Sequence, residues 1–243
     1  MLKNIIPNPW EILPQLIGAE LHCELNNIDI DLEKIKSEYL NILKTEKFLN
    51  HSSGAFDGGW GAIGLMTYGG DPYTDMVKSE SESELLPTRL LNSCDYIKKL
   101  LDRIPGKKDR VRFMEVKPNT HVFWHYDDNE TIDDLDYQKN ARLHLPIITS
   151  DKVELMICNQ NTRWRAGKLY YGDFSFPHSI FNGSDVNRIH LIIDVNINDD
   201  LIKMFPKKYL NGTKKRKLIK KICQRSCNLY RKLNIIKSNK KLS

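Results

Sequence analysis

The sequence contains no run of about eighteen consecutive apolar residues, which is the length that a membrane-spanning helix needs. A transmembrane helix is therefore not expected. The opening segment MLKNIIPNPW lacks the apolar core and cleavage site of a secretory signal peptide. Cysteines are few, with five in 243 residues at irregular spacing, and an odd number of cysteines does not suit a disulfide framework. These absences together predict a cytoplasmic protein with free thiols, including Cys223 and Cys227, which have no further metal ligand nearby in the sequence.

Acidic residues are absent from residues 207–243, which hold fourteen Lys and Arg. The formal net charge of the chain is +6, so the remaining residues carry about −8 (6 − 14). Apolar residues recur at helical spacing from Lys214 to Leu233, which predicts a basic amphipathic helix. Such a helix could contact an anionic partner such as lipid, nucleic acid or an acidic protein. The alternative is a solubilising helix that packs on the rest of the chain.

The length and the 40% apolar content are sufficient for one sizeable core. We expect a catalytic domain over residues 1–205, with its core at about 110–197, and a basic, helical extension over residues 206–243. After an irregular lead-in with turn prolines, helices are predicted at Asp31–Glu46, capped by Asp31, and at Thr88–Ile104. Strands are predicted at Glu20–Asn27, Trp60–Tyr68, Val111–Val116, His121–Tyr126, Arg142–Thr149, Val153–Cys158, Arg163–Tyr170, Asp173–Phe176 and Arg188–Val195.

Many short strands joined by turns favour a mainly β fold, either a sandwich or a barrel. A double-stranded β-helix, which is the cupin-like jelly roll, would bring the ends of several separated strands to one opening. We therefore predict this fold, with the N-terminal helices packed on it and the basic tail following.

The segment from His121 to Val195 contains the residues of greatest chemical interest. It holds His125 and Asp127 as an H-x-D pair, followed at a distance by His178. Two histidines and one carboxylate are the set that holds non-haem Fe(II) and leaves positions open for substrate and dioxygen. Residues two apart on a strand face the same side, so His125 and Asp127 would face one centre, with His178 supplied by another strand. The alternative is a surface His and Asp at a strand end, because H-x-D is common by chance.

Two arginines and a histidine belong to apolar strands in the same segment. Arg188 follows His178 by ten positions and begins the strand R-I-H-L-I-I-D-V, while Arg142 and His144 alternate in A-R-L-H-L-P-I. A buried Arg is costly unless it meets an anion, and its planar fork suits a carboxylate. The pattern therefore suggests a dicarboxylate co-substrate. The alternative pairs Arg142 and Arg188 with Asp or Glu on neighbouring strands.

The segment resembles the aspartyl/asparaginyl β-hydroxylase family of Fe(II)/2-oxoglutarate-dependent dioxygenases, which is related to the free-proline hydroxylases. The resemblance covers roughly Val111 to Val195, and no single motif in it is specific by itself. The matching pieces are T-H-V-F-W-H-Y-D (Thr120–Asp127), R-L-H-L-P-I (Arg142–Ile147), G-D-F-S-F-P-H (Gly172–His178) and N-R-I-H-L-I-I-D-V (Asn187–Val195).

The resemblance implies roles for individual residues. It makes His125, Asp127 and His178 the iron ligands, and a carboxylate at Asp127 places the chain nearer the bacterial members with a full triad than the animal members with Gly there. It makes Arg188 the residue that binds the distal carboxylate of 2-oxoglutarate. It implies that Arg142 and His144 contact the metal-proximal carboxylate. One position departs from the pattern, because Met114 stands near a Ser that helps to bind the co-substrate in some members.

The expected activity is hydroxylation of an unactivated carbon of an amino acid or a peptidyl side chain. Fe(II) is the expected bound metal, 2-oxoglutarate and O2 are the expected co-substrates, and succinate and CO2 are released. Trp60 and Tyr68 are candidates to line the substrate entrance, although ordinary core or rim aromatics are the alternative. The acidic segment Asp128–Asn140 could hold a cationic substrate group or could be a solvated loop.

Two other functions fit the same residues. One is a non-enzymatic cupin-like binding module whose basic tail binds an acidic partner or nucleic acid. The other is an enzyme with the same metal set but without 2-oxoglutarate, such as an isomerase. The substrate and the oligomeric state do not follow from the sequence.

Overall fold

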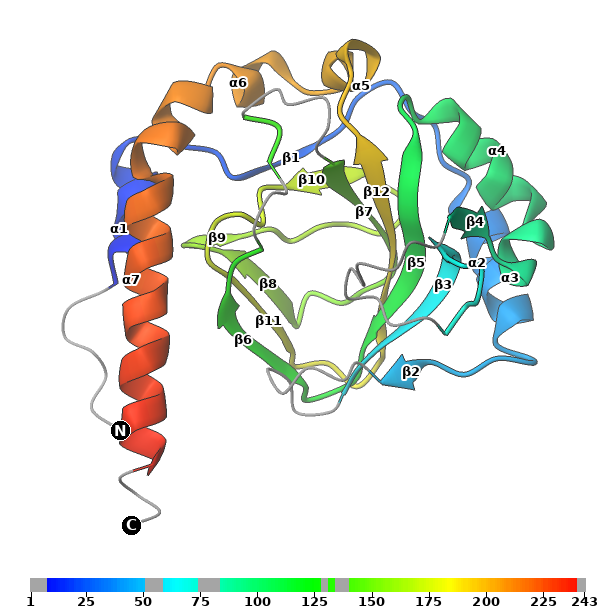
Figure 1. The fold of residues 1–243 in the computed structure, drawn as a ribbon, viewed down its shortest axis with the longest axis horizontal. Helices are drawn as coiled ribbons and strands as arrows, with labels where there is room; N and C mark the ends of the chain where they lie inside the picture. Colours follow the sequence, from blue (N-terminus) through cyan, green and yellow to red (C-terminus); the bar gives the residue numbers. More distant parts are fainter. Residues whose placement is uncertain (1–7, 51–58, 74–83, 128–130, 134–139, 240–243) are drawn as a thin grey trace.

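The computed structural model describes residues 8–50, 59–73, 84–127, 131–133 and 140–239 (Figure 1). The helices are α1 (Pro9–Leu16), α2 (Leu32–Ile42), α3 (Arg89–Asn92), α4 (Asp95–Arg103), α5 (Asp199–Lys203), α6 (Lys207–Leu210) and α7 (Thr213–Asn239). The strands are β1 (His22–Glu24), β2 (Leu49–Asn50), β3 (Trp60–Tyr68), β4 (Leu85–Pro87), β5 (Lys108–Val116), β6 (His121–His125), β7 (Asn140–Ile148), β8 (Val153–Ile157), β9 (Gln160–Asn161), β10 (Tyr170–Gly172), β11 (His178–Asn182) and β12 (Arg188–Asn196).

The strands form two antiparallel sheets that face each other (Figure 1). The large sheet has the order β1-β10-β7-β12-β5-β3-β2, with β4 beside β3, and the small sheet has the order β6-β11-β8-β9. Along the chain, β5, β7, β10 and β12 join the large sheet, whereas β6, β8, β9 and β11 join the small one. This crossing path is that of a double-stranded β-helix. The predicted mainly β jelly roll is therefore confirmed.

The alternation of side chains along β12 divides it between two environments. Ile189, Leu191, Ile193 and Val195 belong to the main hydrophobic core, which also includes residues of α2, α3 and α4. The residues between them point to the opposite face. There Arg188, His190, Ile192 and Asp194 face the interior between the sheets, and all are buried. A strand that reads as almost entirely apolar thus places three polar side chains inside the barrel.

The helix predicted at Asp31–Glu46 is present as α2, and Asp31 caps it by accepting a hydrogen bond from the backbone N–H of Lys34 at 3.2 Å. The helix predicted at Thr88–Ile104 is wrong as a single element, because α3 and α4 are separated at Ser93. The hydroxyl of Ser93 donates to the carbonyl of Leu90 at 2.8 Å. Serine competes in this way with the helical hydrogen-bond pattern and favours its interruption.

Three further predictions need correction. The lead-in is not irregular throughout, since Pro9 occupies the first position of α1, where its missing N–H costs nothing. The strand predicted at Arg163–Tyr170 is mostly a loop, because Arg163 and Gly167 adopt positive φ values of 43° and 79°. The strand predicted at Asp173–Phe176 is a tight turn, in which Asp173 accepts a hydrogen bond from the backbone N–H of Ser175 at 3.2 Å.

Residues of the tail form α7, which stands along the small-sheet side of the barrel beside α1 (Figure 1). Trp10 of α1 contacts Tyr230 of α7 edge-on, with ring centroids 5.5 Å apart. Ile219, Cys223 and Cys227 of α7 belong to a second hydrophobic cluster, which also includes Trp10, Leu155 and Phe176. Within the described part of the chain, no helix combines the length and the apolarity needed to cross a bilayer.

Candidate metal centre and co-substrate pocket

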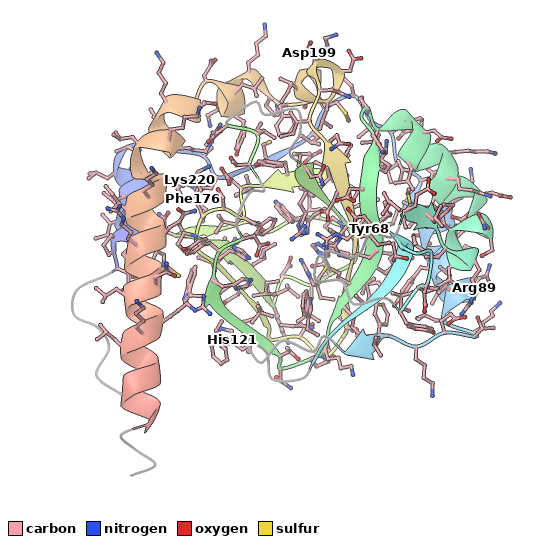
Figure 2. The ribbon with its side chains drawn as sticks, viewed as in Figure 1. Tyr68, Arg89, His121, Phe176, Asp199 and Lys220 are labelled. Atoms are coloured by element: carbon pink, nitrogen blue, oxygen red, sulfur yellow. The ribbon has the colours of Figure 1, made fainter. Side chains whose placement is uncertain are left out.

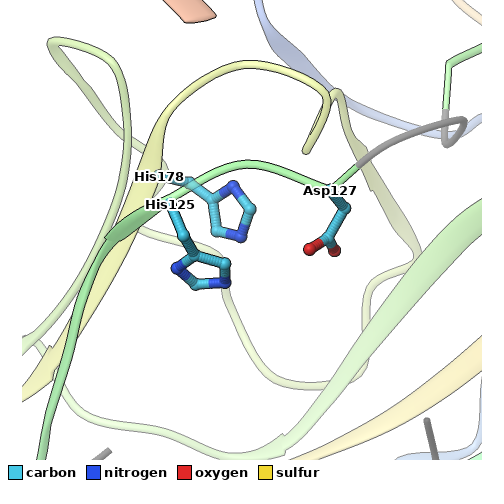
Figure 3. A group of neighbouring side chains, drawn as sticks. All are labelled: His125, Asp127 and His178. Carbon is cyan, nitrogen blue, oxygen red and sulfur yellow. The ribbon is translucent and has the colours of Figure 1, made fainter. Parts of the chain in front are cut away.

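His125, Asp127 and His178 converge on one point (Figure 3). One ligand atom from each side chain lies within 4.8 Å of the ligand atoms of the other two. The convergence follows from strand pairing, because β6 and β11 are antiparallel and His125 is the Cα partner of His178. Asp127 lies two residues beyond the end of β6, where its backbone N–H donates to the carbonyl of Phe174 at 2.9 Å. The sequence therefore predicted a triad that the structure brings together.

Both imidazoles are oriented by backbone carbonyls. The Nδ1 atom of His125 lies 2.7 Å from the carbonyl oxygen of Phe123, and that of His178 lies 3.0 Å from the carbonyl oxygen of Phe176. A carbonyl only accepts, so the proton of each neutral ring is on Nδ1. The lone pair of each neutral ring is therefore on Nε2, the form in which an imidazole binds a metal.

Electrostatics favour the ligand forms of the triad. Burial lowers the pKa of His178 to about 3, with a further lowering from the neighbouring His125, so the ring is neutral at pH 7. Burial raises the pKa of Asp127, but His178, Arg142 and His125 together outweigh it, and the net shift is downward. A neutral imidazole and an ionised carboxylate are what a divalent cation requires.

A buried carboxylate lies beside the triad and was not singled out from the sequence. Asp194 accepts hydrogen bonds from Arg112 at 2.8 Å and from the Nε of Arg142 at 2.9 Å, and Arg110 lies 3.4 Å away. Burial alone would raise the pKa of Asp194, but the three guanidinium groups lower it strongly. The signal in the sequence was an acidic residue inside the apolar run of β12.

Arg142 joins Asp194 to the triad. Its Nη1 donates to Oδ2 of Asp127 at 2.9 Å while its Nε and Nη2 bond Asp194. These contacts match the alternative in which Arg142 pairs with acidic residues. Contact between Arg142 and the metal-proximal carboxylate of a co-substrate stays a proposal.

Arg188 differs from the other arginines inside the barrel. Its side chain is 2% exposed, and it forms no ion pair with any carboxylate that the structure describes. Burial lowers its pKa to about 9. One Nη2 bond reaches Nδ1 of His190 at 2.9 Å, and Nε has no hydrogen-bond partner within the described ranges. A buried cation in this state is complementary to an anionic ligand.

A cavity of about 530 Å³ lies against Arg188. Its wall includes His190, Trp164, Val153 and Leu155. This volume falls within the range of small-molecule sites, roughly 300–1,000 Å³. The space is therefore large enough for a dicarboxylate.

A series of rings connects the cavity with the triad. Phe174 contacts His178 at 4.7 Å and His144 at 4.8 Å between ring centroids, and His144 lies 5.1 Å from Trp164. The Nε2 atom of His144 is buried and has no partner in the part of the chain that the structure describes. Contact between this atom and the metal-proximal carboxylate of a co-substrate stays a proposal.

Sequence reasoning missed His190 and Trp164. His190 is the Cα partner of Met114 on β5, which lies near the position where the resemblance places a Ser in some family members. The alternation of His190 with Arg188 was a usable signal, whereas Trp164 lay in a segment wrongly predicted to be a strand.

Trp60 and Tyr68 do not share one opening. They are the first and last residues of β3, so at about 3.3 Å per residue their Cα atoms are roughly 26 Å apart. Trp60 pairs in register with Val116, which also pairs with Arg188. The hydroxyl of Tyr68 donates to Asp109 at 3.0 Å at the other end (Figure 2). A substrate role for either ring stays a proposal, but the two do not act at the same place.

Most of the acidic segment Asp128–Asn140 lies outside the described residues, but Thr131 to Asp133 are described. Asp133 is not available to a substrate. It forms a fully buried ion pair with Arg216 of α7, with Nη2 and Oδ1 2.7 Å apart. The expectation of a solvated or substrate-binding segment is therefore wrong for Asp133, because its carboxylate is paired with Arg216 of the basic tail.

One face of α7 holds the segments that surround the metal ligands. Side chains four residues apart lie on the same face of a helix. Four polar residues of α7 have this spacing. Arg216 donates to Asp133 at 2.7 Å, and Lys220 donates to Thr131 at 3.0 Å. Gln224 donates to the carbonyl of Ser175 at 2.8 Å, and Asn228 donates to the hydroxyl of Tyr126 at 2.7 Å. Lys220 also lies 5.7 Å above the ring of Phe176 (Figure 2). These acceptors follow or precede Asp127 and His178 closely in the chain.

A jelly roll that holds two histidines and one carboxylate between its sheets has the architecture of the non-haem iron oxygenases. Comparison with known families agrees with this class. Residues 30–197 match the family described as Aspartyl/Asparaginyl beta-hydroxylase, and the chain belongs to that family. The protein is accordingly a hydroxylase, as its sequence predicted.

Solved structures with a related fold are distant in sequence. The epimerase SnoN of nogalamycin biosynthesis is 11% identical over 76% of this chain and 81% of its own, with a TM-score of 0.47. A prolyl hydroxylase from Trichoplax adhaerens, in complex with a hypoxia inducible factor peptide fragment, is 11% identical over 81% and 93%, with a TM-score of 0.46. A prolyl-4-hydroxylase from Pseudomonas putida is 9% identical over 78% and 99%, with a TM-score of 0.42. None of the curated proteins compared with the chain matches it.

Proposed function

We propose that the protein is an Fe(II)/2-oxoglutarate-dependent dioxygenase that hydroxylates an unactivated carbon of an amino acid or a peptidyl side chain, with release of succinate and CO2. The observation that carries this proposal is the combination of the converging triad with a buried Arg188 that has no carboxylate partner among the described residues. A metal-only site would not need the buried cation, and a simple anion site would not need the triad.

The residues of the site fit both Fe(II) and 2-oxoglutarate. His125 and His178 would bind the metal through Nε2, and Asp127 would bind it through its carboxylate. This donor set suits Fe(II) and leaves coordination positions for other ligands. Arg188 would bind the distal carboxylate of 2-oxoglutarate, to which its planar fork is matched. The unpartnered Nε of Arg188 and Nε2 of His144 are the atoms that such a ligand would satisfy.

When bound, Fe(II) and 2-oxoglutarate supply the activation of dioxygen, which protein side chains do not provide. The chain contributes position and shielding. Arg142 holds Asp127 in one orientation, and the carbonyls of Phe123 and Phe176 hold the two imidazoles. Phe174 and Trp164 place apolar ring surface beside the space between the triad and Arg188, which would keep water away from a bound co-substrate. A carboxylate at position 127 would bind the metal where related halogenases have a small residue and leave room for halide, so hydroxylation is the expected outcome.

The test is a screen of free amino acids and short peptides with the full chain, Fe(II), 2-oxoglutarate and air. Mass spectrometry should find a product heavier by one oxygen atom, with stoichiometric succinate. Anaerobic addition of 2-oxoglutarate to the Fe(II) protein should produce a visible charge-transfer band even without a substrate. If the band is absent and 2-oxoglutarate does not bind, the chain is a cupin-like binding module or uses the metal for another reaction.

A further inference from the structure

An apolar stripe on the outer face of α7 is not covered by the rest of the described structure. Leu218, Ile222, Leu229 and Leu233 are 71%, 50%, 59% and 49% exposed. Their spacing of four, seven and four residues places them in one line along the helix. The inward face of the same helix is already filled by Ile219, Cys223 and Cys227. The helix therefore has two apolar faces, and in the part of the chain that the structure describes one of them packs against the barrel while the other is exposed.

A row of cations runs beside this stripe. Four exposed cations lie along α7 on the side of the helix next to the apolar stripe: Lys214, Lys221, Arg225 and Lys232. Residues 207–243 contain no acidic residue that could neutralise them. Long cationic side chains can extend their charged ends to the headgroup level while their stems and the neighbouring leucines lie deeper.

The adjacent helix α1 also has exposed apolar side chains. Ile12 and Leu16 of α1 are 41% and 74% exposed, and α1 packs directly beside α7. Of the twelve large hydrophobic side chains that are exposed in the described structure, six therefore lie on these two helices. The 27 residues of α7 span about 40 Å, which gives a long and nearly straight face.

We propose that this face, formed by the exposed stripe of α7 with its row of cations, binds the surface of an anionic lipid bilayer. A second copy of the chain is a poor occupant, because two helices without acidic residues repel each other. Nucleic acid would engage the cations but gain nothing from the leucines, since its surface is a charged phosphate backbone. A bilayer with anionic headgroups can bind the row of cations through its headgroups and the apolar stripe through its acyl chains. The proposal does not depend on the metal or on 2-oxoglutarate.

The experiment is co-sedimentation of the full chain with vesicles of phosphatidylcholine containing phosphatidylglycerol, and with vesicles of phosphatidylcholine alone. We expect binding to the anionic vesicles that weakens with added salt, and little binding to the neutral ones. The double variant L218Q/L229Q should bind at least about tenfold more weakly, because it removes two membrane-facing side chains. Both positions are exposed, so its circular dichroism and melting temperature should match those of the parent protein.

Leu40→Gln is the matched control, since Leu40 is 56% exposed on α2, away from α7. Its vesicle binding should equal that of the parent protein. Three outcomes would overturn the proposal: no binding to anionic vesicles, equal loss in the Leu40 variant, or loss in a K214Q/R225Q variant but none in L218Q/L229Q. The last outcome would indicate adsorption by charge alone. Binding of the same proteins to duplex DNA is measured in parallel. If the chain does not bind vesicles, and both the parent protein and L218Q/L229Q bind DNA tightly, nucleic acid is the partner instead.

Discussion

The carboxylate of Asp127 accepts a hydrogen bond from Nη1 of Arg142 at 2.9 Å, and Arg142 in turn bonds Asp194. The proposed metal centre is therefore the end of a charged network inside the barrel, in which Asp194 collects three arginines. Arg188 stands apart from this network and bonds His190. The arginines that bond Asp194 are thus paired with a carboxylate, whereas Arg188 has no carboxylate partner among the described residues.

Asp127→Ala should abolish or nearly abolish turnover and weaken metal binding by at least about 100-fold, because one of three protein ligands is lost. Metal content after dialysis and succinate release measure the two effects. Asp185→Ala, at an exposed position, is the control and should leave both unchanged. Near-normal activity of the Asp127 variant would remove the ligand assignment.

Arg188→Ala should raise the 2-oxoglutarate concentration needed for half-maximal succinate release by about 100-fold, since it removes a buried charged partner of the ligand. Arg188→Lys should recover only part of the loss, because an ammonium lacks the planar fork. Metal content should stay nearly intact in both variants. A 2-oxoglutarate requirement equal to that of the parent would show that Arg188 binds something else.

His190→Ala should also raise the 2-oxoglutarate requirement, by about tenfold, because Arg188 loses the imidazole that positions its Nη2. Since His190 pairs across the sheet with Met114, Met114→Ser in the His190→Ala background should restore part of the affinity by supplying a hydroxyl at the same end of the pocket. Titration of the anaerobic charge-transfer band with 2-oxoglutarate measures all three proteins. If Met114→Ser weakens binding further, His190 and Met114 do not share one function.

Asp194→Asn should lower the free energy of unfolding by about 3–5 kcal/mol, because it leaves buried guanidinium groups without their counter-ion. Urea unfolding at pH 7 measures the change, with Asp185→Asn as the control. The native pKa of Asp194 is lowered, so its stabilising effect is complete above the unfolded value of about 4 and is lost progressively as the pH falls below it. The parent protein should therefore lose stability below pH ~4 more steeply than the Asn variant does. Equal slopes would contradict the assignment.

The double variant Q224A/N228A should weaken metal binding by about tenfold, because two hydrogen bonds from α7 to the segments around Asp127 and His178 are lost. Lys232→Ala, on the exposed side of α7, is the control. Metal titration separates this effect from a loss of stability, which unfolding curves report independently. Weaker metal binding with an unchanged 2-oxoglutarate requirement at saturating metal is the expected combination. An unchanged metal affinity would limit α7 to a packing role.

The sequence by itself determined the local parts of this site. Strand alternation placed Arg142 with His144 on β7, and the start of β12 at Arg188 could be read from its apolar run. The H-x-D spacing predicted that His125 and Asp127 face one centre, although Asp127 lies beyond the end of β6 and is held there by the carbonyl of Phe174. Many short strands indicated a sandwich or a barrel, and the need to bring His125, Asp127 and His178 to one opening selected the jelly roll. The loop at Arg163–Tyr170 and the turn at Asp173–Phe176 could not be read in this way, because positive φ values and a side chain-to-backbone bond decided them.

Only the tertiary structure decided which buried arginines pair with a carboxylate and which one has no carboxylate partner among the described residues. Arg112 and Asp194 are 82 residues apart in the sequence, and Tyr126 and Asn228 are 102 apart, so no local pattern relates them. Arg142 and Arg188 look equivalent in the sequence, yet one meets two carboxylates and the other meets none that the structure describes. The reason is physical: burial makes each charge depend on its neighbours in space, and sheet register, not sequence distance, selects those neighbours.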